Sequence, residues 1–211
     1  MKDTRFSQFV IFINSAVPLA LLGWDAYHRR LGANPYEFAT RTTGVLTLVF
    51  VMLSLSVTPL RKALGLPWMI KFRRLLGLYG FFYGAVHLLT YVWFDKFFNL
   101  SAIGQDIVKR PFITVGMAGF VLLVPLALTS TQKSIKRLGG KRWNLLHRAV
   151  YVAAACGVIH FYMLVKADTR EPILFGVALA ALLGYRLLNK LAPGITQRTP
   201  SRTPSQVRPR G

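Results

Sequence analysis

Six stretches of this 211-residue chain contain no Asp, Glu, Lys or Arg, and most are about as long as a helix that crosses a bilayer. They are residues 6–24, 42–60, 75–94, 111–132, 149–165 and 172–185. Two leucines extend the last stretch beyond Arg186, whose long side chain we expect to reach the membrane interface. None of the stretches alternates as a barrel strand does, and lipid leaves the backbone only helices or closed barrels. The sequence therefore predicts an all-α polytopic membrane protein, a six-transmembrane-helix bundle.

The basic residues indicate how this bundle is oriented. If the six helices alternate in direction, both termini share one side with residues 61–74 and 133–148. That side carries most of the 27 Lys and Arg, and the other side carries all but one of the seven acidic residues. The positive-inside rule therefore predicts that both termini are cytoplasmic. The net charge of +20 is explained by topology and by contact with anionic membrane lipid, and it indicates no nucleic-acid partner.

The sequence indicates one domain followed by a tail. Residues 1–192 hold all six predicted helices, and residues 193–211, rich in Pro, Ser, Thr and Arg, are typical of a disordered basic cytoplasmic tail. The single Cys156 excludes an internal disulfide. No Gly-rich dinucleotide-binding motif joins a strand to a helix, so reducing equivalents would come from outside the chain.

Three of the four histidines lie in or at the edge of the predicted helices. A helix that begins near Leu75 places His87 about 18 Å in from the cytoplasmic side, and one that begins near His147 places His160 at about 20 Å. The two side chains are therefore expected at the same height, where they can be axial ligands of one haem iron. Because ionisable groups at membrane depth are costly, they are usually functional. The alternative is a pair of hydrogen-bonded structural histidines.

His147 lies nearer the cytoplasmic face, and no histidine occurs at its height on the helix of His87. Arg73 is expected at that level, on nearly the same helix face as His87. It could pair with a haem propionate or, less commonly, approach the iron. Since thirteen residues of an ideal helix turn His147 and His160 to different faces, both can serve haems in one bundle only with a local distortion, for which Gly157 is a candidate, or with different directions of approach.

Three segments resemble one known family. They are residues 74–91 (RLLGLYGFFYGAVHLLTY), 109–130 (KRPFITVGMAGFVLLVPLALTS) and 138–161 (LGGKRWNLLHRAVYVAAACGVIHF). They are similar to the haem-binding membrane subunits of the periplasmic protein-methionine-sulfoxide reductase system, the MsrQ family, within the ferric-reductase-like transmembrane group. The resemblance spans roughly residues 5–190.

The resemblance implies haem ligands at His87, His147 and His160, with Arg73 at the level where the wider group often has a fourth histidine. It implies one or two b-type haems, an association with FMN, and a multi-pass location in the bacterial inner (cytoplasmic) membrane. Electrons would come from quinol or from a cytoplasmic flavin reductase. They would leave to a periplasmic molybdopterin-containing subunit that reduces methionine sulfoxide in oxidised proteins. The chain would thus be an electron-transfer subunit and not a complete catalyst.

Two other functions remain open at this stage. A stand-alone transmembrane ferric reductase would use the same haems but release electrons to free metal ions. A non-redox transporter or assembly scaffold would bind no haem and tolerate substitution of the histidines. The absence of Asp and Glu from the six uncharged stretches argues against ion transport.

Overall fold

The computed structural model describes residues 4–191, and the predicted tail, residues 193–211, lies outside the described residues. All regular secondary structure in this part of the chain is helical, which confirms the all-α fold. The long helices are α1 (Thr4–Tyr27), α2 (Pro35–Ala63), α3 (Ile70–Thr90), α5 (Pro111–Leu128), α8 (Ala149–Leu164) and α9 (Arg170–Leu191). The short elements are η1 (Pro67–Met69), the π-helical turn η2 (Tyr91–Asp95), α4 (Leu100–Lys109), α6 (Gln132–Leu138) and α7 (Gly140–Leu146).

The structure has six helical segments that are long and apolar enough to cross a membrane, which confirms the predicted six spans. Several extend beyond the uncharged stretches, and α2 shows why. It begins seven residues earlier than predicted, because Asn34 caps it by accepting a hydrogen bond from the Glu37 backbone N–H at 3.2 Å. The side-chain amide of Asn34 also donates to the Glu37 carboxylate at 3.0 Å. Polar capping therefore starts the helix before its apolar stretch begins.

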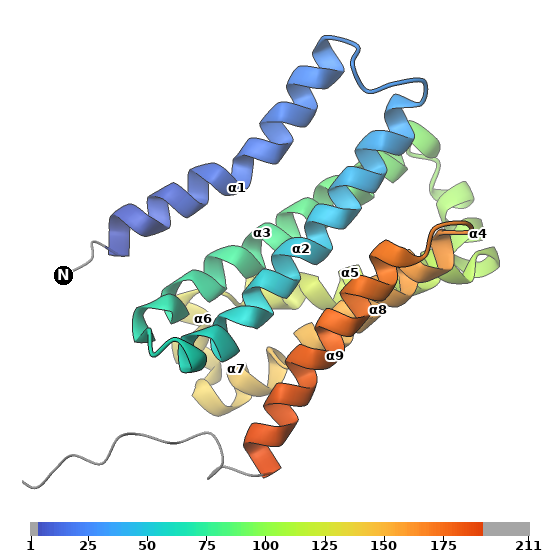
Figure 1. Ribbon diagram of the computed structural model, residues 1–211. Helices are drawn as coiled ribbons and strands as arrows, with labels where there is room; N and C mark the ends of the chain where they lie inside the picture. The colour runs from blue at the N-terminus through green and yellow to red at the C-terminus, as the bar shows by residue number, and fades with distance from the viewer. Residues whose placement is uncertain (1–3, 192–211) are drawn as a thin grey trace, which may run out of the picture.

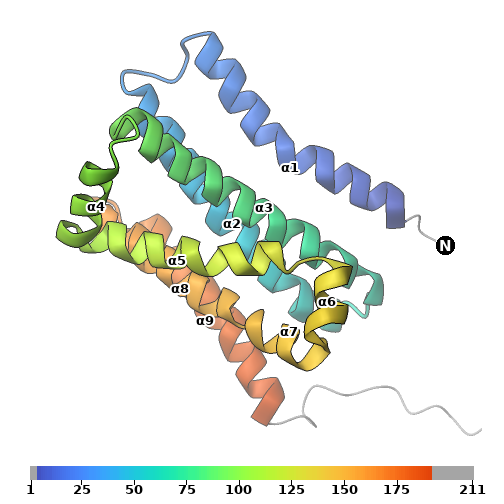
Figure 2. The same ribbon diagram turned by 180° about the vertical axis from the view of Figure 1, so that it is seen from behind.

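The six long helices alternate in direction and leave two distinct ends (Figures 1 and 2). We call one the terminal end, since it holds residues 4 and 191 together with the connections 64–69 and 129–148. The other, the α4 end, holds the connections 28–34, 96–110 and 165–169. The placing of the terminal end in the cytoplasm remains a prediction from charge.

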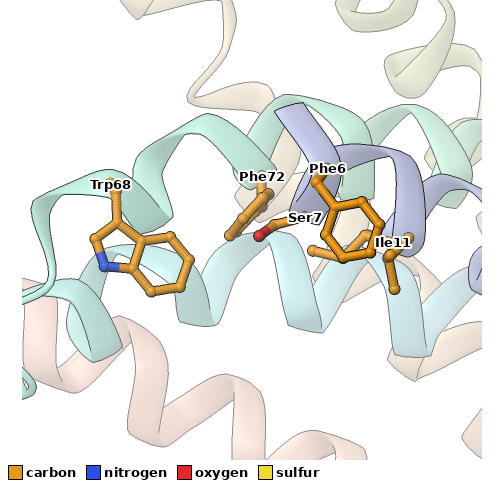
Figure 3. A pocket seen from close by; sticks show the side chains of 6 residues that line it. Phe6, Ser7, Ile11, Trp68 and Phe72 are labelled. Carbon is orange, nitrogen blue, oxygen red and sulfur yellow. The ribbon is translucent and has the colours of Figure 1, made fainter. Parts of the chain in front are cut away.

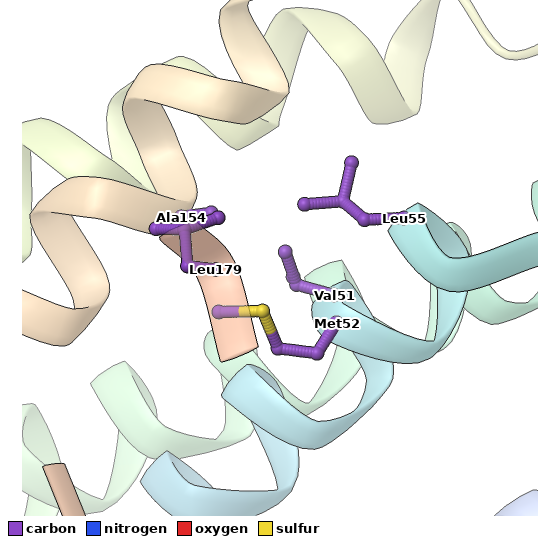
Figure 4. Close-up of a cluster of buried hydrophobic side chains, with 5 residues drawn as sticks. All are labelled: Val51, Met52, Leu55, Ala154 and Leu179. Atoms are coloured by element: carbon purple, nitrogen blue, oxygen red, sulfur yellow. The ribbon is translucent and has the colours of Figure 1, made fainter. Parts of the chain in front are cut away.

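The centre of the bundle consists of two helix pairs. Helix α2 packs along α3, and α5 packs along α8, while contacts between the two pairs are sparser. The pairs meet at a buried cluster from α2, α8 and α9, shown in Figure 4: Val51, Met52, Leu55, Ala154 and Leu179. Glycines allow close approach within and between the pairs. A Cβ on Gly80 of α3 would lie 2.8 Å from Val51, and one on Gly157 of α8 would lie 2.8 Å from Leu48.

Helix α1 lies at the side of this four-helix core (Figure 1) and is attached through two tyrosines of α3. The Tyr79 hydroxyl donates to the Phe12 carbonyl and the Tyr83 hydroxyl donates to the Ser15 carbonyl, each at 2.7 Å. Tyr83 is fully buried and stacks on Phe50 of α2 at 5.2 Å between ring centroids. Two phenols therefore anchor a helix whose own side chains are mostly exposed.

Two expectations from the sequence are wrong in detail. Arg186 does not extend to the membrane interface: it points inward, where its Nη2 donates to the Leu55 carbonyl at 2.7 Å. His147 and His160 do not share a continuous helix, since α7 ends at Leu146 and α8 begins at Ala149. The helix is interrupted at residues 147–148 and not at Gly157, which packs closely against Leu48 of α2.

Candidate functional site

The structure brings His87 of α3 and His160 of α8 together between the two helix pairs. Their ring centroids are 6.1 Å apart and the ring planes are inclined at 78°. Both residues lie in the half of the bundle nearer the α4 end, because α3 continues only three residues beyond His87 and α8 only four beyond His160. This is the one contact between histidine rings in the described part of the chain.

Each imidazole is oriented by a backbone carbonyl on the partner helix of its own pair. Nδ1 of His87 lies 2.9 Å from the Thr40 carbonyl of α2, and Nδ1 of His160 lies 2.7 Å from the Phe112 carbonyl of α5. A carbonyl only accepts, so each Nδ1 carries the proton and donates. The neutral tautomer this fixes leaves Nε2 of each ring with a free lone pair, which is the usual arrangement of a metal-ligating histidine.

A glycine one turn beyond each carbonyl makes room for the ring. A Cβ on Gly44 would lie 3.0 Å from Cε1 and Nδ1 of His87, and a Cβ on Gly116 would lie 2.7 Å from Nδ1 of His160. In a helix the carbonyl of residue n points toward residue n+4, so a side chain there would cover it. Thr40 and Phe112 are both followed at n+4 by glycine. The two glycines thus expose the carbonyls that orient the histidines.

The spacing of the rings fits two imidazoles on opposite sides of one iron. Metal–imidazole nitrogen bonds are about 2 Å long, and each nitrogen lies roughly 1 Å from its ring centre, so the centroids should be about 6 Å apart. The observed 6.1 Å agrees with that distance. No group of three or more His, Cys, Asp or Glu with metal-binding geometry occurs within residues 4–191. The donor set is therefore two imidazoles, which suits a metal whose other ligands come from a macrocycle.

His147 occupies a separate position at the terminal end. Its Nε2 lies 3.1 Å from the Thr129 hydroxyl, and its ring stacks on Trp143 with 3.8 Å between centroids. The Trp143 indole in turn donates to the Thr129 carbonyl at 2.9 Å. Hydrogen bonding therefore holds His147 in place, and the structure does not bring it to His87 or His160.

Arg73, near the start of α3, and His147, between α7 and α8, both belong to the terminal end of the bundle. The Arg73 backbone carbonyl accepts a hydrogen bond from the Ser54 hydroxyl of α2 at 2.9 Å. No carboxylate forms an ion pair with Arg73 in the described segment. The level of His147 therefore has a single histidine and a cation instead of a histidine pair.

Acidic and basic side chains also meet at the α4 end. The Asp106 carboxylate of α4 accepts from the Lys96 ammonium at 2.6 Å, the Tyr91 hydroxyl at 3.0 Å and Arg110 Nε at 3.4 Å. Lys96 also lies 3.2 Å from Asp95. The hydrogen bond from Lys96 holds the pKa of Asp106 below its usual value, and the same bond raises the pKa of Lys96. These contacts fasten α4 across its end of the bundle.

A shallow apolar groove of about 250 Å³ runs between α1 and the start of α3 near the terminal end (Figure 3). It is lined by Phe6, Ser7, Val10, Ile11, Trp68 and Phe72. The groove is on the outer side of α3, whereas the histidine pair lies between α3 and α8, so it is separate from the candidate site.

Sequence reasoning found the histidines but missed Gly44 and Gly116. A signal was present, because Gly44 is the sole glycine in the stretch 42–60. A lone glycine in a membrane helix is as compatible with helix packing as with a ring contact. Only the spatial pairing of each glycine with one histidine distinguishes the two roles.

Comparison with known proteins agrees with this architecture. Residues 40–158, more than half of the chain, match the family model of the ferric reductase like transmembrane component. Six apolar helices and a histidine pair between two helix pairs thus define a ferric-reductase-like transmembrane protein.

Named relatives identify the family within this class. A protein of Herminiimonas arsenicoxydans is 49% identical over 84% of this chain and 83% of its own length, and one of Rhodospirillum rubrum is 46% identical over 97% of both. One of Azospira oryzae is 47% identical over 90% of this chain and 83% of its own length. Each is named protein-methionine-sulfoxide reductase heme-binding subunit MsrQ. The chain belongs to the MsrQ family.

Proposed function

We propose that this chain is the haem b electron-transfer subunit of a methionine-sulfoxide reductase system. Electrons enter from the quinol pool or from a cytoplasmic flavin reductase and cross the bacterial inner membrane. They leave to a periplasmic molybdopterin-containing reductase that repairs oxidised proteins. The observation that carries the proposal is the His87–His160 pair. The ring centroids are 6.1 Å apart, and both Nδ1 atoms form hydrogen bonds with helix carbonyls.

In this proposal His87 and His160 hold a haem iron through their Nε2 atoms. The haem supplies one-electron exchange between ferric and ferrous iron. The Thr40 and Phe112 carbonyls keep both rings in the ligating tautomer, which raises their basicity toward the metal. Because the rings are held from two separate helix pairs, the ligands are preorganised before the cofactor binds.

The position of the pair supports the direction of transfer. With the termini in the cytoplasm, the α4 end is periplasmic, and His87 and His160 lie in that half. His147 lies at the opposite end, about 20 Å of helix rise away from His160. Together with Arg73 it is the proposed place of a second haem near the cytoplasmic donor, where His147 Nε2 would exchange the Thr129 hydroxyl for the iron. FMN is proposed from the family resemblance alone, without assigned residues.

The first test is a visible spectrum of the detergent-purified full chain, oxidised and then reduced with dithionite, with haem quantified per chain. We expect the α-band of a reduced b-type haem at one or two haems per chain. A colourless protein, expressed with ample haem, would contradict the proposal and favour a transporter or scaffold.

A second measurement separates this function from that of a stand-alone ferric reductase. The reduced protein is mixed either with a ferric chelate or with a periplasmic molybdopterin methionine-sulfoxide reductase. The proposal predicts faster haem reoxidation by the protein partner in the presence of methionine sulfoxide. Fast reoxidation by the chelate, with none by the partner, would support the ferric reductase instead.

A further inference from the structure

Arg186 of α9 is a half-buried cation that the histidine pair does not use. Its Nη2 donates to the Leu55 carbonyl at 2.7 Å, and its Cζ lies 4.8 Å from the centre of the Tyr151 ring. These contacts hold the guanidinium between α2 and α8. Its Nη1 is buried and has no hydrogen-bond partner. One edge of the guanidinium is thus fixed while two of its N–H donors are unused.

A second unsatisfied atom occurs on α2, near the Leu55 carbonyl that Arg186 contacts. The Thr58 hydroxyl of α2 is buried without a hydrogen-bond partner, and Thr58 lies three residues after Leu55, on the same helix face. These two are the only buried side-chain N or O atoms without a partner among residues 4–191. Their shared location indicates a common cause.

Arg73 of α3 belongs to the same end of the bundle. Ser54, one turn before Thr58 on α2, donates a 2.9 Å hydrogen bond to the Arg73 backbone carbonyl, which holds the start of α3 against this part of α2. The five ion pairs within the described part of the chain include neither arginine. Neither guanidinium is therefore balanced by a carboxylate of the described residues.

Unpaired buried donors and unbalanced charge each cost free energy, and native proteins normally satisfy both. The missing partner must accept hydrogen bonds and carry negative charge, and a planar guanidinium matches carboxylate and phosphate oxygens best. We propose that Arg186, Thr58 and Arg73 form an oxyanion-binding site at the terminal end of the bundle. It binds the carboxylate or phosphate group of a ligand that enters between α2, α3 and α9. Iron ligation by His87 and His160 is not required for this site.

The experiment compares ligand pairs that differ only in their anionic group. The full chain in detergent is titrated with protohaem and with its dimethyl ester, which lacks the carboxylates, and separately with FMN and riboflavin. We expect the wild type to bind the charged member of one pair about tenfold more tightly, as charge-assisted hydrogen bonds allow. A preference within the haem pair identifies the anion as a propionate, and one within the flavin pair identifies it as a phosphate.

In Arg186→Gln the preference should fall to about twofold or less. Lys190→Gln is the matched control, because Lys190 is an exposed cation one turn further along α9. Thr58→Val keeps the shape of the side chain and should lower the preference for the charged ligand severalfold. It is the variant to use if Arg186→Gln does not fold. The proposal is overturned if the wild type distinguishes neither pair or if both variants keep the full preference. Because the flavin pair needs no iron, failure of haem binding would be seen separately.

Discussion

His87 and His160 are held 6.1 Å apart by the same local arrangement used twice. In each helix pair a carbonyl at residue n accepts from the histidine Nδ1, and a glycine at n+4 leaves the space for the ring. The arrangement appears in α2 with α3 and again in α5 with α8. Each histidine ring is therefore fixed through its Nδ1 by a neighbouring helix, and the two Nε2 atoms are left for a ligand.

Alanine at Gly116 should disrupt this arrangement more than alanine at Gly44. The new Cβ would lie 2.7 Å from His160 Nδ1, against 3.0 Å from His87 Nδ1, so the ring of His160 must move further. We expect Gly116→Ala to lose most of its bound haem and Gly44→Ala to lose part of it, measured as haem per purified chain. Gly184→Ala is the control, because nothing lies within 4 Å of its Cβ position. Wild-type haem content in Gly116→Ala would show that the glycine does not support the site.

His147→Ala should leave the haem between His87 and His160 intact. His147 bonds to Thr129 and stacks on Trp143 at the terminal end, without contact to the pair. We expect the variant to retain a low-spin b-type spectrum with at most one haem per chain. Complete loss of haem from a folded His147→Ala protein would contradict the assignment of the first site.

Asp106→Asn should weaken the attachment of α4 in a pH-dependent way. Because the pKa of Asp106 is lowered by Lys96, its stabilisation is complete above the unfolded value of about 3.9 and is lost as the pH falls through the lower folded value. Because the pKa of Lys96 is raised, its contribution persists below about 10.4 and is lost as the pH rises through the higher folded value.

The measurement is thermal unfolding in detergent across this pH range. Asp106→Asn should lower the Tm at neutral pH, and the difference from wild type should vanish in strong acid. Asp168→Asn is the control, because the ion pair of Asp168 with Arg170 is exposed and long at 3.9 Å, and Asn can still accept the hydrogen bond from the Arg170 backbone N–H. If Asp106→Asn has the same Tm as the wild type at pH 7, the Asp106 carboxylate does not stabilise the attachment of α4.

Tyr83→Phe should loosen α1 without disturbing the histidine pair. The substitution removes the 2.7 Å hydrogen bond to Ser15 but keeps the stack on Phe50. We expect a loss of about 1 kcal/mol in stability and faster proteolysis near residues 28–34, with unchanged haem content. If haem is lost as well, α1 contributes more to the core than its few contacts indicate.

The length of the uncharged stretches was enough to predict six membrane helices, and helical rise was enough to predict that His87 and His160 lie at the same height. Three other features could be recognised only from the fold. Arg186 was expected at the interface because snorkelling is the common solution for a terminal arginine. Pro59 has no N–H and so leaves the Leu55 carbonyl without a helix donor, but only the fold shows that Arg186 reaches it. The break between α7 and α8 at residues 147–148 is seen only in the fold. The roles of Gly44 and Gly116 depend on which helices pair.

The most direct test of the central claim is the spectrum of the oxidised and reduced protein after single replacement of each paired histidine. His87→Ala and His160→Ala should each abolish the same low-spin b-type signal, because one iron needs both ligands. His28→Ala should keep it, because His28 is exposed and bonds only its own helix at Trp24. A low-spin signal that survives in folded His87→Ala or His160→Ala protein would contradict a haem held by this pair.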